Sequence, residues 1–205
     1  MKEPINSLLK NLDESLNSSA LWLCFEEENT MNFTASDFLL QILKTGEFHH
    51  ALVKSDCARD FDNYVELLIE NNILKRKAFS GTTYNGESNL ILNPITKADA
   101  KQYLIELLTG IGQHFSKSIY GKFVSFQEAE ILINNVFQYF NPSKEEILFY
   151  QVSPNFLWKV NDIHDDASLA QLGFFEGHHK DFVLIIQSTK SQKINLHILL
   201  TNGFG

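Results

Sequence analysis

Apolar residues recur every three or four positions in five stretches of the first 140 residues. In the first such stretch, residues 5–16, the apolar side chains are those of Ile5, Leu8, Leu9, Leu12 and Leu16. Further stretches with the same spacing cover residues 38–43, 61–69, 100–115 and 129–140. A period of about 3.6 residues is typical of a helix with one face in a core. The first part of the chain is therefore predicted to be mainly helical.

Three of these predicted helices are preceded by a hydroxyl residue with a carboxylate three positions later. The pairs are Thr34 with Asp37, Thr96 with Asp99, and Ser125 with Glu128. In such a capping box the two side chains satisfy backbone N–H groups at the start of a helix. We therefore expect long helices over residues 97–118 and 125–140. Gly110 and Gly112 fall inside the first of these, where each glycine weakens a helix by roughly 1 kcal/mol relative to alanine.

After residue 146 the apolar pattern becomes that of β-strands. Strands are predicted over residues 147–152, 156–160, 182–187 and 194–201. The last two form an apolar β-hairpin in which both faces are hydrophobic, which is typical of strands at the centre of a sheet. An earlier segment, residues 20–26, is short, apolar and aromatic, and its length favours a strand over a helix.

These patterns predict an α+β fold. A mainly helical N-terminal part is followed by two long helices packed on a mostly antiparallel C-terminal sheet. The corresponding domains are residues 1–95 and 96–205. Two alternatives stay open: one continuous domain, and a boundary near residues 141–144, where helices give way to strands.

The order of elements before residue 95 resembles a winged helix-turn-helix. Residues 60–72 take the position of the recognition helix, and residues 73–93 form a hairpin that Pro94 ends. A helix that reads DNA needs lysine and arginine near the phosphates. Residues 56–72 instead carry five carboxylates and one arginine, and the only basic cluster is residues 75–77. Nucleic-acid binding is therefore the least favoured hypothesis, and a winged-helix unit would serve structure or protein contact.

The net charge of −8 lies entirely in the first third of the chain. Residues 1–72 contain 13 acidic and 5 basic residues, whereas residues 73–205 contain 12 of each. An acidic surface repels phosphate backbones and anionic membranes and attracts basic proteins. The candidate partner-binding residues are Glu26, Glu27, Glu28, Asp60, Asp62, Glu66 and Glu70. The alternative is an acidic surface that only keeps the protein in solution.

Histidines and an aspartate of the C-terminal third form a second candidate site. Its members are His164, Asp165, His178, His179 and His197. Imidazole and carboxylate groups together can bind a metal or exchange protons. Adjacent side chains on a strand point to opposite faces, so at most one of His178 and His179 reaches a shared site unless the turn redirects both. His197 faces away from the Ile/Leu face of its strand. No metal-binding spacing such as H-E-x-x-H is present, so hydrogen-bonded histidines without a metal are the favoured interpretation.

The sequence contains none of the common catalytic or cofactor motifs. A nucleophile elbow, a phosphate-binding loop and a dinucleotide fingerprint are all absent, and we expect no cofactor. Cys24 and Cys57 are expected to be buried, reduced thiols. No apolar run is long enough to cross a bilayer, and the N-terminus lacks the apolar centre of a secretory signal. These features lead us to expect a cytosolic protein.

The favoured function is that of a non-catalytic protein-interaction module with an acidic surface. An immunity-type inhibitor of a basic toxin or enzyme is one form of it, and an adaptor or chaperone is another. An acidic surface suits such roles because it attracts a partner that has a cationic cleft and can then occupy that cleft. The alternative is an enzyme or a ligand- or metal-binding protein that uses the His/Asp site. The oligomeric state is left open.

Overall fold

The computed structural model describes residues 2–18, 20–28, 34–45, 47–48, 51–52, 55, 91–115, 119–140, 145–152, 181–190 and 193–202. The chain divides into two compact units. The first comprises residues 1–32, 92–152 and 178–205, and the second comprises residues 33–91 and 153–177. The domain boundaries predicted from the sequence stay predictions. Each unit is described by itself below.

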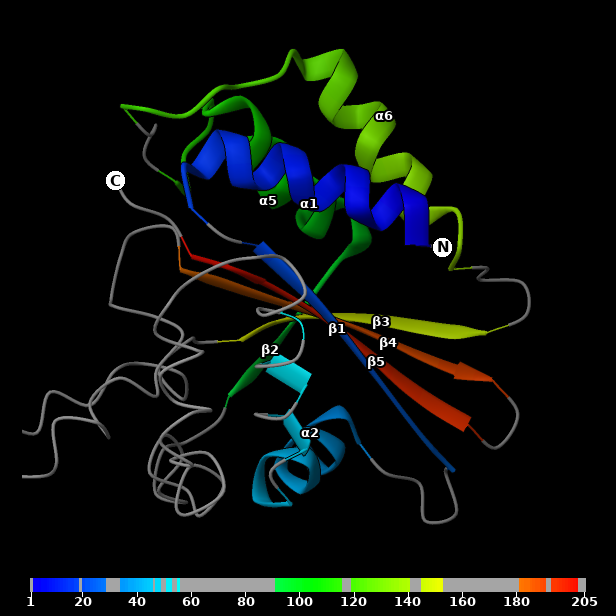
Figure 1. Ribbon diagram of the computed structural model, residues 1–205. Coiled ribbons are helices and arrows are strands. Elements are labelled where there is room, and N and C mark those ends of the chain that lie inside the picture. Colours follow the sequence, from blue (N-terminus) through cyan, green and yellow to red (C-terminus); the bar gives the residue numbers. More distant parts are fainter. Residues whose placement is uncertain are drawn as a thin grey trace, which may run out of the picture. The chain divides into compact units, whose positions relative to one another are not determined.

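The first unit is built on a five-stranded antiparallel sheet (Figure 1). Its strands are β1 (Ala20–Glu28), β2 (Leu92–Ile95), β3 (Glu146–Val152), β4 (Phe182–Lys190) and β5 (Lys193–Thr201). They lie side by side in the order β1-β5-β4-β3-β2. Together with the helices, this sheet confirms the predicted α+β fold. It also shows that the N-terminal strand belongs to the same sheet as the C-terminal strands.

The β4–β5 hairpin lies in the interior of the sheet, as its apolar sequence predicts. Lys190 pairs with Lys193 next to the turn, and Phe182 pairs with Thr201 at the other end. Leu184 and Leu199 are buried on one face of the hairpin, and Ile185 is buried on the other. Strands buried on both faces have continuous apolar sequences, which explains why this stretch is the most hydrophobic of the chain.

Three helices of the first unit cover one face of the sheet (Figure 1). They are α1 (Lys2–Leu16), α5 (Lys97–Thr109) and α6 (Phe126–Phe137). A single hydrophobic cluster joins them to the sheet, with Leu8 from α1, Leu104 from α5, Ile133 from α6, and Phe149 and Leu199 from the strands. The predicted packing of two long helices on the sheet is thus present, with α1 as a third member of the layer.

The helix α1 forms where the spacing of its apolar residues predicts it. Ile5, Leu8, Leu9, Leu12 and Leu16 are all buried, and they fall three or four residues apart on one face of the helix. Burying one leucine or isoleucine side chain contributes roughly 1.5–3 kcal/mol, so this face anchors the helix to the core.

All three predicted capping boxes are present. The Thr96 hydroxyl accepts a hydrogen bond from the Asp99 N–H at 3.1 Å, and the Asp99 carboxylate accepts the Thr96 N–H at 2.8 Å. Ser125 and Glu128 repeat this arrangement at the start of α6. The third box, Thr34 with Asp37, belongs to the second unit. Hydrogen bonds from the hydroxyl and the backbone of Thr96 lower the pKa of Asp99, so the carboxylate stays ionised.

The helix predicted over residues 97–118 is shorter than expected, because it ends at Thr109. Gly110 follows in the left-handed conformation with φ 63°, and its N–H donates to the carbonyl of Glu106 at 2.9 Å. Glycine adopts this conformation without steric cost and commonly ends helices in this way. A Cβ at position 110 would also lie 2.6 Å from the ring of Phe123. The prediction that the helix passes through Gly110 is therefore wrong.

Pro94 does not end a strand, as the sequence pattern suggested, but lies within β2. Among the described strands, β2 pairs with β3 alone and so forms an edge of the sheet, with Pro94 opposite Tyr150. Proline lacks an N–H, and an edge strand tolerates it because one side of the strand needs no ladder hydrogen bond. A short edge strand that contains proline also resists pairing with another chain.

In the second unit the structure describes α2 (Ala35–Lys44), whose buried side chains include Phe38, Leu39 and Ile42. The predicted recognition helix, residues 60–72, lies outside the described residues, as do nearly all of the predicted hairpin and the predicted strand 156–160. The winged-helix arrangement therefore stays a prediction. No helix among the described residues is long and apolar enough to span a membrane.

Candidate functional site

The three consecutive glutamates lie at the C-terminal end of the edge strand β1. Glu26 and Glu28 are exposed, and they stand opposite Asn195 and Lys193 of β5. Glu27 points to the other face of the sheet, because side chains alternate along a strand. The Lys193 ammonium bonds the Glu26 carboxylate, with 2.5 Å between Nζ and Oε1. This hydrogen bond, with the negative charges of Glu26 and Glu28, raises the pKa of Lys193.

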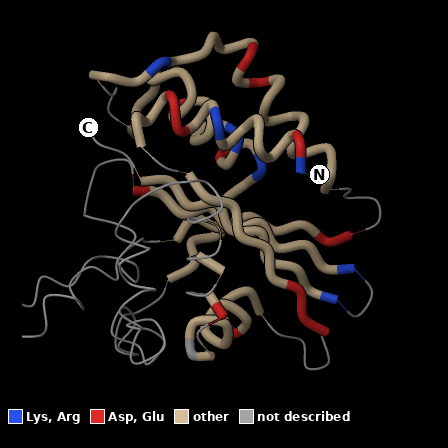
Figure 2. The backbone as a smooth tube through the Cα atoms, viewed as in Figure 1, with Lys and Arg blue, Asp and Glu red and all other residues tan. Residues whose placement is uncertain are grey.

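Charged residues from other strands gather at the same end of the sheet (Figure 2). Lys190 pairs with Lys193 across the hairpin, and Glu146 begins β3 opposite Thr189, directly after Glu145. We call this group the acidic sheet end, and it comprises Glu26, Glu27, Glu28, Glu145, Glu146, Lys190 and Lys193. Among the described residues it sets five carboxylates against two ammonium groups, so the local charge is negative.

The other predicted partner-binding residues are Asp60, Asp62, Glu66 and Glu70. They lie outside the described part of the chain. Their place in a contact surface stays a prediction.

Of the predicted His/Asp site, the structure describes only His197. It lies on β5 opposite Cys24, on the face of the sheet that carries the helices, and it is 6 % exposed. Its ring packs edge-on against Phe140, with 5.0 Å between the centroids, and lies 6.1 Å from the ring of Trp22. As the alternation of side chains along a strand predicts, Ile198 and Leu196 face the opposite side.

Burial makes His197 a neutral residue at physiological pH. Desolvation lowers its pKa to about 4, against a smaller opposing effect of the negative charge of Glu145. Neither His197 Nδ1 nor the nearby Trp22 Nε1 has a hydrogen-bond partner among the described protein groups. An imidazole enclosed by aromatic rings is poorly placed to reach a dissolved metal or substrate.

His164, Asp165, His178 and His179 lie outside the described residues, so the structure does not test whether they approach His197. Within the described ranges, no group of three or more His, Cys, Asp or Glu side chains could hold a metal ion. The metal-site hypothesis stays a prediction.

Cys24 differs from its prediction, because the residue is exposed on the edge strand rather than buried. Partial desolvation of the thiol and the negative charge of Glu26 raise its pKa. The reactive form of cysteine is the thiolate, so this environment makes Cys24 a weak nucleophile. Cys57 lies outside the described residues, and its burial stays a prediction.

A pair of side chains that the sequence analysis did not select has the clearest chemical geometry in the described structure. Glu106, in the last turn of α5, is 2 % exposed. Its Oε1 lies 2.8 Å from Nδ1 of His114, and its Oε2 accepts the backbone N–H of His114 at 2.8 Å. Gln102 donates a third hydrogen bond to Oε1 at 3.0 Å. Burial raises the pKa of Glu106, but the bonds from Gln102 and His114 outweigh it and the pKa is lowered.

The backbone makes room for this pair at Gly112. A Cβ at position 112 would lie 2.0 Å from Cδ of Glu106, so any other residue would displace the carboxylate. On its other side, the His114 ring meets the ring of Tyr103 edge-on, with 4.6 Å between the centroids. Tyr103 in turn packs against Phe115 and Phe182, which ties the pair to the core.

The Glu106–His114 pair lines an open cavity of about 550 Å³ between the end of α5 and the start of α6. Ile105, Val124 and Phe126 contribute apolar walls. In the sequence this site is indicated by one feature, a carboxylate within an otherwise apolar helical segment. The partner of this carboxylate, His114, follows eight residues later and beyond the end of the helix. Outside a helix, the spacing of residues in the sequence does not predict where a side chain lies.

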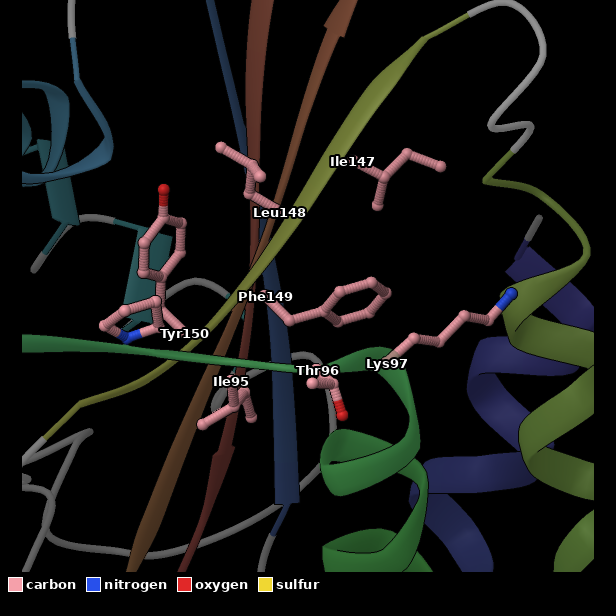
Figure 3. A pocket seen from close by; sticks show the side chains of 8 residues that line it. Ile95, Thr96, Lys97, Ile147, Leu148, Phe149 and Tyr150 are labelled. Atoms are coloured by element: carbon pink, nitrogen blue, oxygen red, sulfur yellow. The ribbon is translucent and has the colours of Figure 1, made fainter.

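A second cavity, of about 310 Å³, lies where β2 and β3 meet the start of α5 (Figure 3). Ile147 and Phe149 point to the same side of β3 as Lys97, whereas Leu148 and Tyr150 point to the other side. The Lys97 ammonium lies 5.5 Å from the centre of the Phe137 ring. This cavity therefore offers apolar walls and one cation that already packs on an aromatic ring.

No protein-family model matches the chain, and neither do any curated protein sequences or solved structures.

Proposed function

We propose that the protein is a non-catalytic interaction module that binds a basic protein partner. The acidic sheet end carries this proposal. Four of its five carboxylates project from paired strands and Glu145 directly precedes one, so the strand backbone fixes the positions of the four before a partner arrives. Only Glu26 among them has a close cationic partner among the described residues. Complementary charge of this kind speeds association and selects partners more than it adds affinity.

The geometry also suits a partner that approaches the end of the sheet rather than its face. Glu26 and Glu28 point to one face and Glu27 to the other, so the three carboxylates surround the end of β1. A cationic cleft or loop can contact both sides of such an end at once. We include Asp60, Asp62, Glu66 and Glu70 in the proposed surface on the strength of their sequence pattern.

An immunity-type inhibitor of a basic toxin or enzyme is one form of this function. An adaptor or chaperone for a basic protein is another. We further propose that the protein acts in the cytosol, which the free thiol of Cys24 supports.

The test uses the full chain as bait and then quantifies the partner it captures. The triple variant Glu26→Gln, Glu27→Gln, Glu28→Gln removes three charges from the acidic sheet end. The control Glu3→Gln, Glu14→Gln, Glu47→Gln removes three exposed charges elsewhere. We expect a captured protein of basic pI whose affinity falls about tenfold or more in the first variant and less than about twofold in the control. Equal affinities for both variants, or an acidic partner, would contradict the proposal.

A further inference from the structure

The Glu106 carboxylate is ionised although it is buried, because its hydrogen-bond donors outweigh the loss of hydration. It is almost completely buried, and it lies in the last turn of α5, where the helix dipole disfavours an anion. The charge is held by Gln102 and by both the backbone and the ring of His114. The ionised carboxylate in turn acts on the imidazole of His114.

The carboxylate fixes which nitrogen of His114 carries hydrogen in the neutral ring. An ionised carboxylate can only accept hydrogen bonds, so Nδ1, at 2.8 Å from Oε1, must donate. The hydrogen is therefore on Nδ1, and Nε2 keeps a free lone pair. Among the described residues no donor bonds to Nε2, and the side chain of His114 is 48 % exposed. The ring thus presents a fixed acceptor to solvent beside the cavity.

The cavity around this acceptor has the size and character of a small-molecule site. Its volume of about 550 Å³ is within the range of roughly 300–1,000 Å³ that is usual for ligand pockets. Two of its lining side chains, Ile111 and Phe126, are 75 % and 56 % exposed. The lining also includes polar side chains, among them Gln102, Thr109 and Gln113. Large apolar side chains left open around a cavity that presents an oriented polar group are typical of a binding site.

We propose that this cavity binds a small aromatic molecule whose hydroxyl or ring N–H donates a hydrogen bond to Nε2 of His114. The apolar walls and the open ring of Phe126 take the aromatic body, since aromatic rings pack on one another edge-on or offset. An aromatic hydroxyl is more acidic than an aliphatic one and donates more strongly, so it competes better with water for Nε2. Glu106 acts as the positioning residue that holds the acceptor in place.

The test compares two matched pairs of probes on the full chain. Phenol and indole carry the donor, whereas anisole and 1-methylindole have the same rings with the donor hydrogen replaced by methyl. Nitrogen-15 NMR of labelled histidine at pH 8 reports the His114 ring directly. Before addition we expect the neutral ring to carry its hydrogen on Nδ1, and phenol or indole should cause a saturable shift of the Nε2 resonance. The methylated probes should bind about tenfold more weakly or worse.

The variant His114→Phe separates binding from a purely structural role. It keeps a ring against Tyr103 and the backbone N–H that bonds Glu106, but it removes Nε2. Phenol and anisole should then bind alike, while the control Ile131→Ala, at an exposed residue outside the cavity, should keep the preference. If His114→Phe does not fold, Glu106→Gln serves instead. That variant should reduce the preference because the tautomer is no longer fixed.

Three results would overturn the proposal. One is an Nε2-protonated neutral ring in the free protein. Another is the absence of any saturable His114 shift with either donor probe. The third is equal binding of donor and methylated probes to the native chain, because a histidine that only fastens the loop after α5 would show no such preference.

Discussion

The buried polar side chains of the first unit differ in how they are satisfied. Glu106 accepts three hydrogen bonds and stays ionised. His197 has no partner at Nδ1 among the described protein groups and stays neutral. A buried group without a partner avoids charge, whereas a buried charge needs several donors. Both environments lower the pKa of the buried group, so each residue is held in its deprotonated form, charged for Glu106 and neutral for His197.

His197 is expected to make the protein less stable as the solution becomes mildly acidic. Its folded pKa of about 4 is below the ordinary value of 6.5, so the unfolded chain takes up the proton first. The contribution is complete above pH 6.5 and is lost as the pH falls toward 4. Between pH 7.5 and 5 the loss amounts to about 2 kcal/mol of unfolding free energy. Denaturant unfolding at both pH values measures it.

The variant His197→Leu provides the control for this loss. It should remove most of the difference between pH 7.5 and 5. The carboxylates with lowered pKa, such as Asp99 and Glu128, lose their stabilisation below their ordinary values of 3.8 and 4.5, outside this window. A native protein equally stable at both pH values would show that His197 is not buried as described.

Gly112→Ala is expected to disrupt the Glu106–His114 pair without straining the backbone. The new Cβ would lie 2.0 Å from Cδ of Glu106, so the carboxylate must leave its three donors. Leaving buried groups unpaired costs about 1–3 kcal/mol. Thermal or denaturant unfolding should show this loss, while Gln113→Ala, at the exposed next residue, should change stability by less than about 0.5 kcal/mol. Equal stability of the two variants would contradict the described geometry.

At the scale of elements, local sequence rules explain the beginnings of helices better than their ends. The boxes at Thr96 and Ser125 have the hydrogen bonds that the spacing predicts. The sequence pattern does not locate the end of α5, because a glycine in a helical pattern can either continue the helix or adopt the left-handed conformation that ends it. Gly110 does the second, and the ring of Phe123 lies where a Cβ would be. The contact between Gly110 and Phe123 depends on the tertiary structure, so the spacing of apolar residues in the sequence does not reveal it.

Removing either capping hydroxyl is expected to destabilise the first unit. Thr96→Ala and Ser125→Ala each leave an N–H without its acceptor and should cost about 1 kcal/mol of unfolding free energy. The conservative exchanges Thr96→Ser and Ser125→Thr should restore most of it. Chemical denaturation of the four variants checks this, and alanine variants as stable as the native chain would show that the caps do not form.

The apolar pattern also predicts which residues form strands more accurately than it predicts the order of those strands in the sheet. The hairpin of β4 and β5 follows from its apolar pattern, and so does its position away from the edges. The edge positions of β1 and β2 do not follow, because strand order depends on which distant segments pair. The Glu106–His114 pair was missed for a related reason. Eight residues and a helix end separate its members, and only the folded loop brings them together.

At the scale of the whole molecule, charge is distributed unevenly along the chain and over the sheet. The first third carries the entire net charge of −8, and part of it lies in Glu26, Glu27 and Glu28. The pairing of β1 with β5 brings these residues to the end of the sheet where Glu145 and Glu146 also lie. An acidic run of the sequence thereby becomes a larger acidic surface. This surface is what the proposed partner would recognise.

The dependence of partner binding on salt tests this account most directly. The association constant of the captured partner is measured by calorimetry over a range of sodium chloride concentrations. For the native chain, we predict that binding weakens steeply as salt rises, because opposite charges at the contact are screened. The triple glutamine variant at Glu26, Glu27 and Glu28 should show a clearly shallower dependence. Binding that is insensitive to salt, or an unchanged dependence in the variant, would contradict the proposed role of the acidic sheet end.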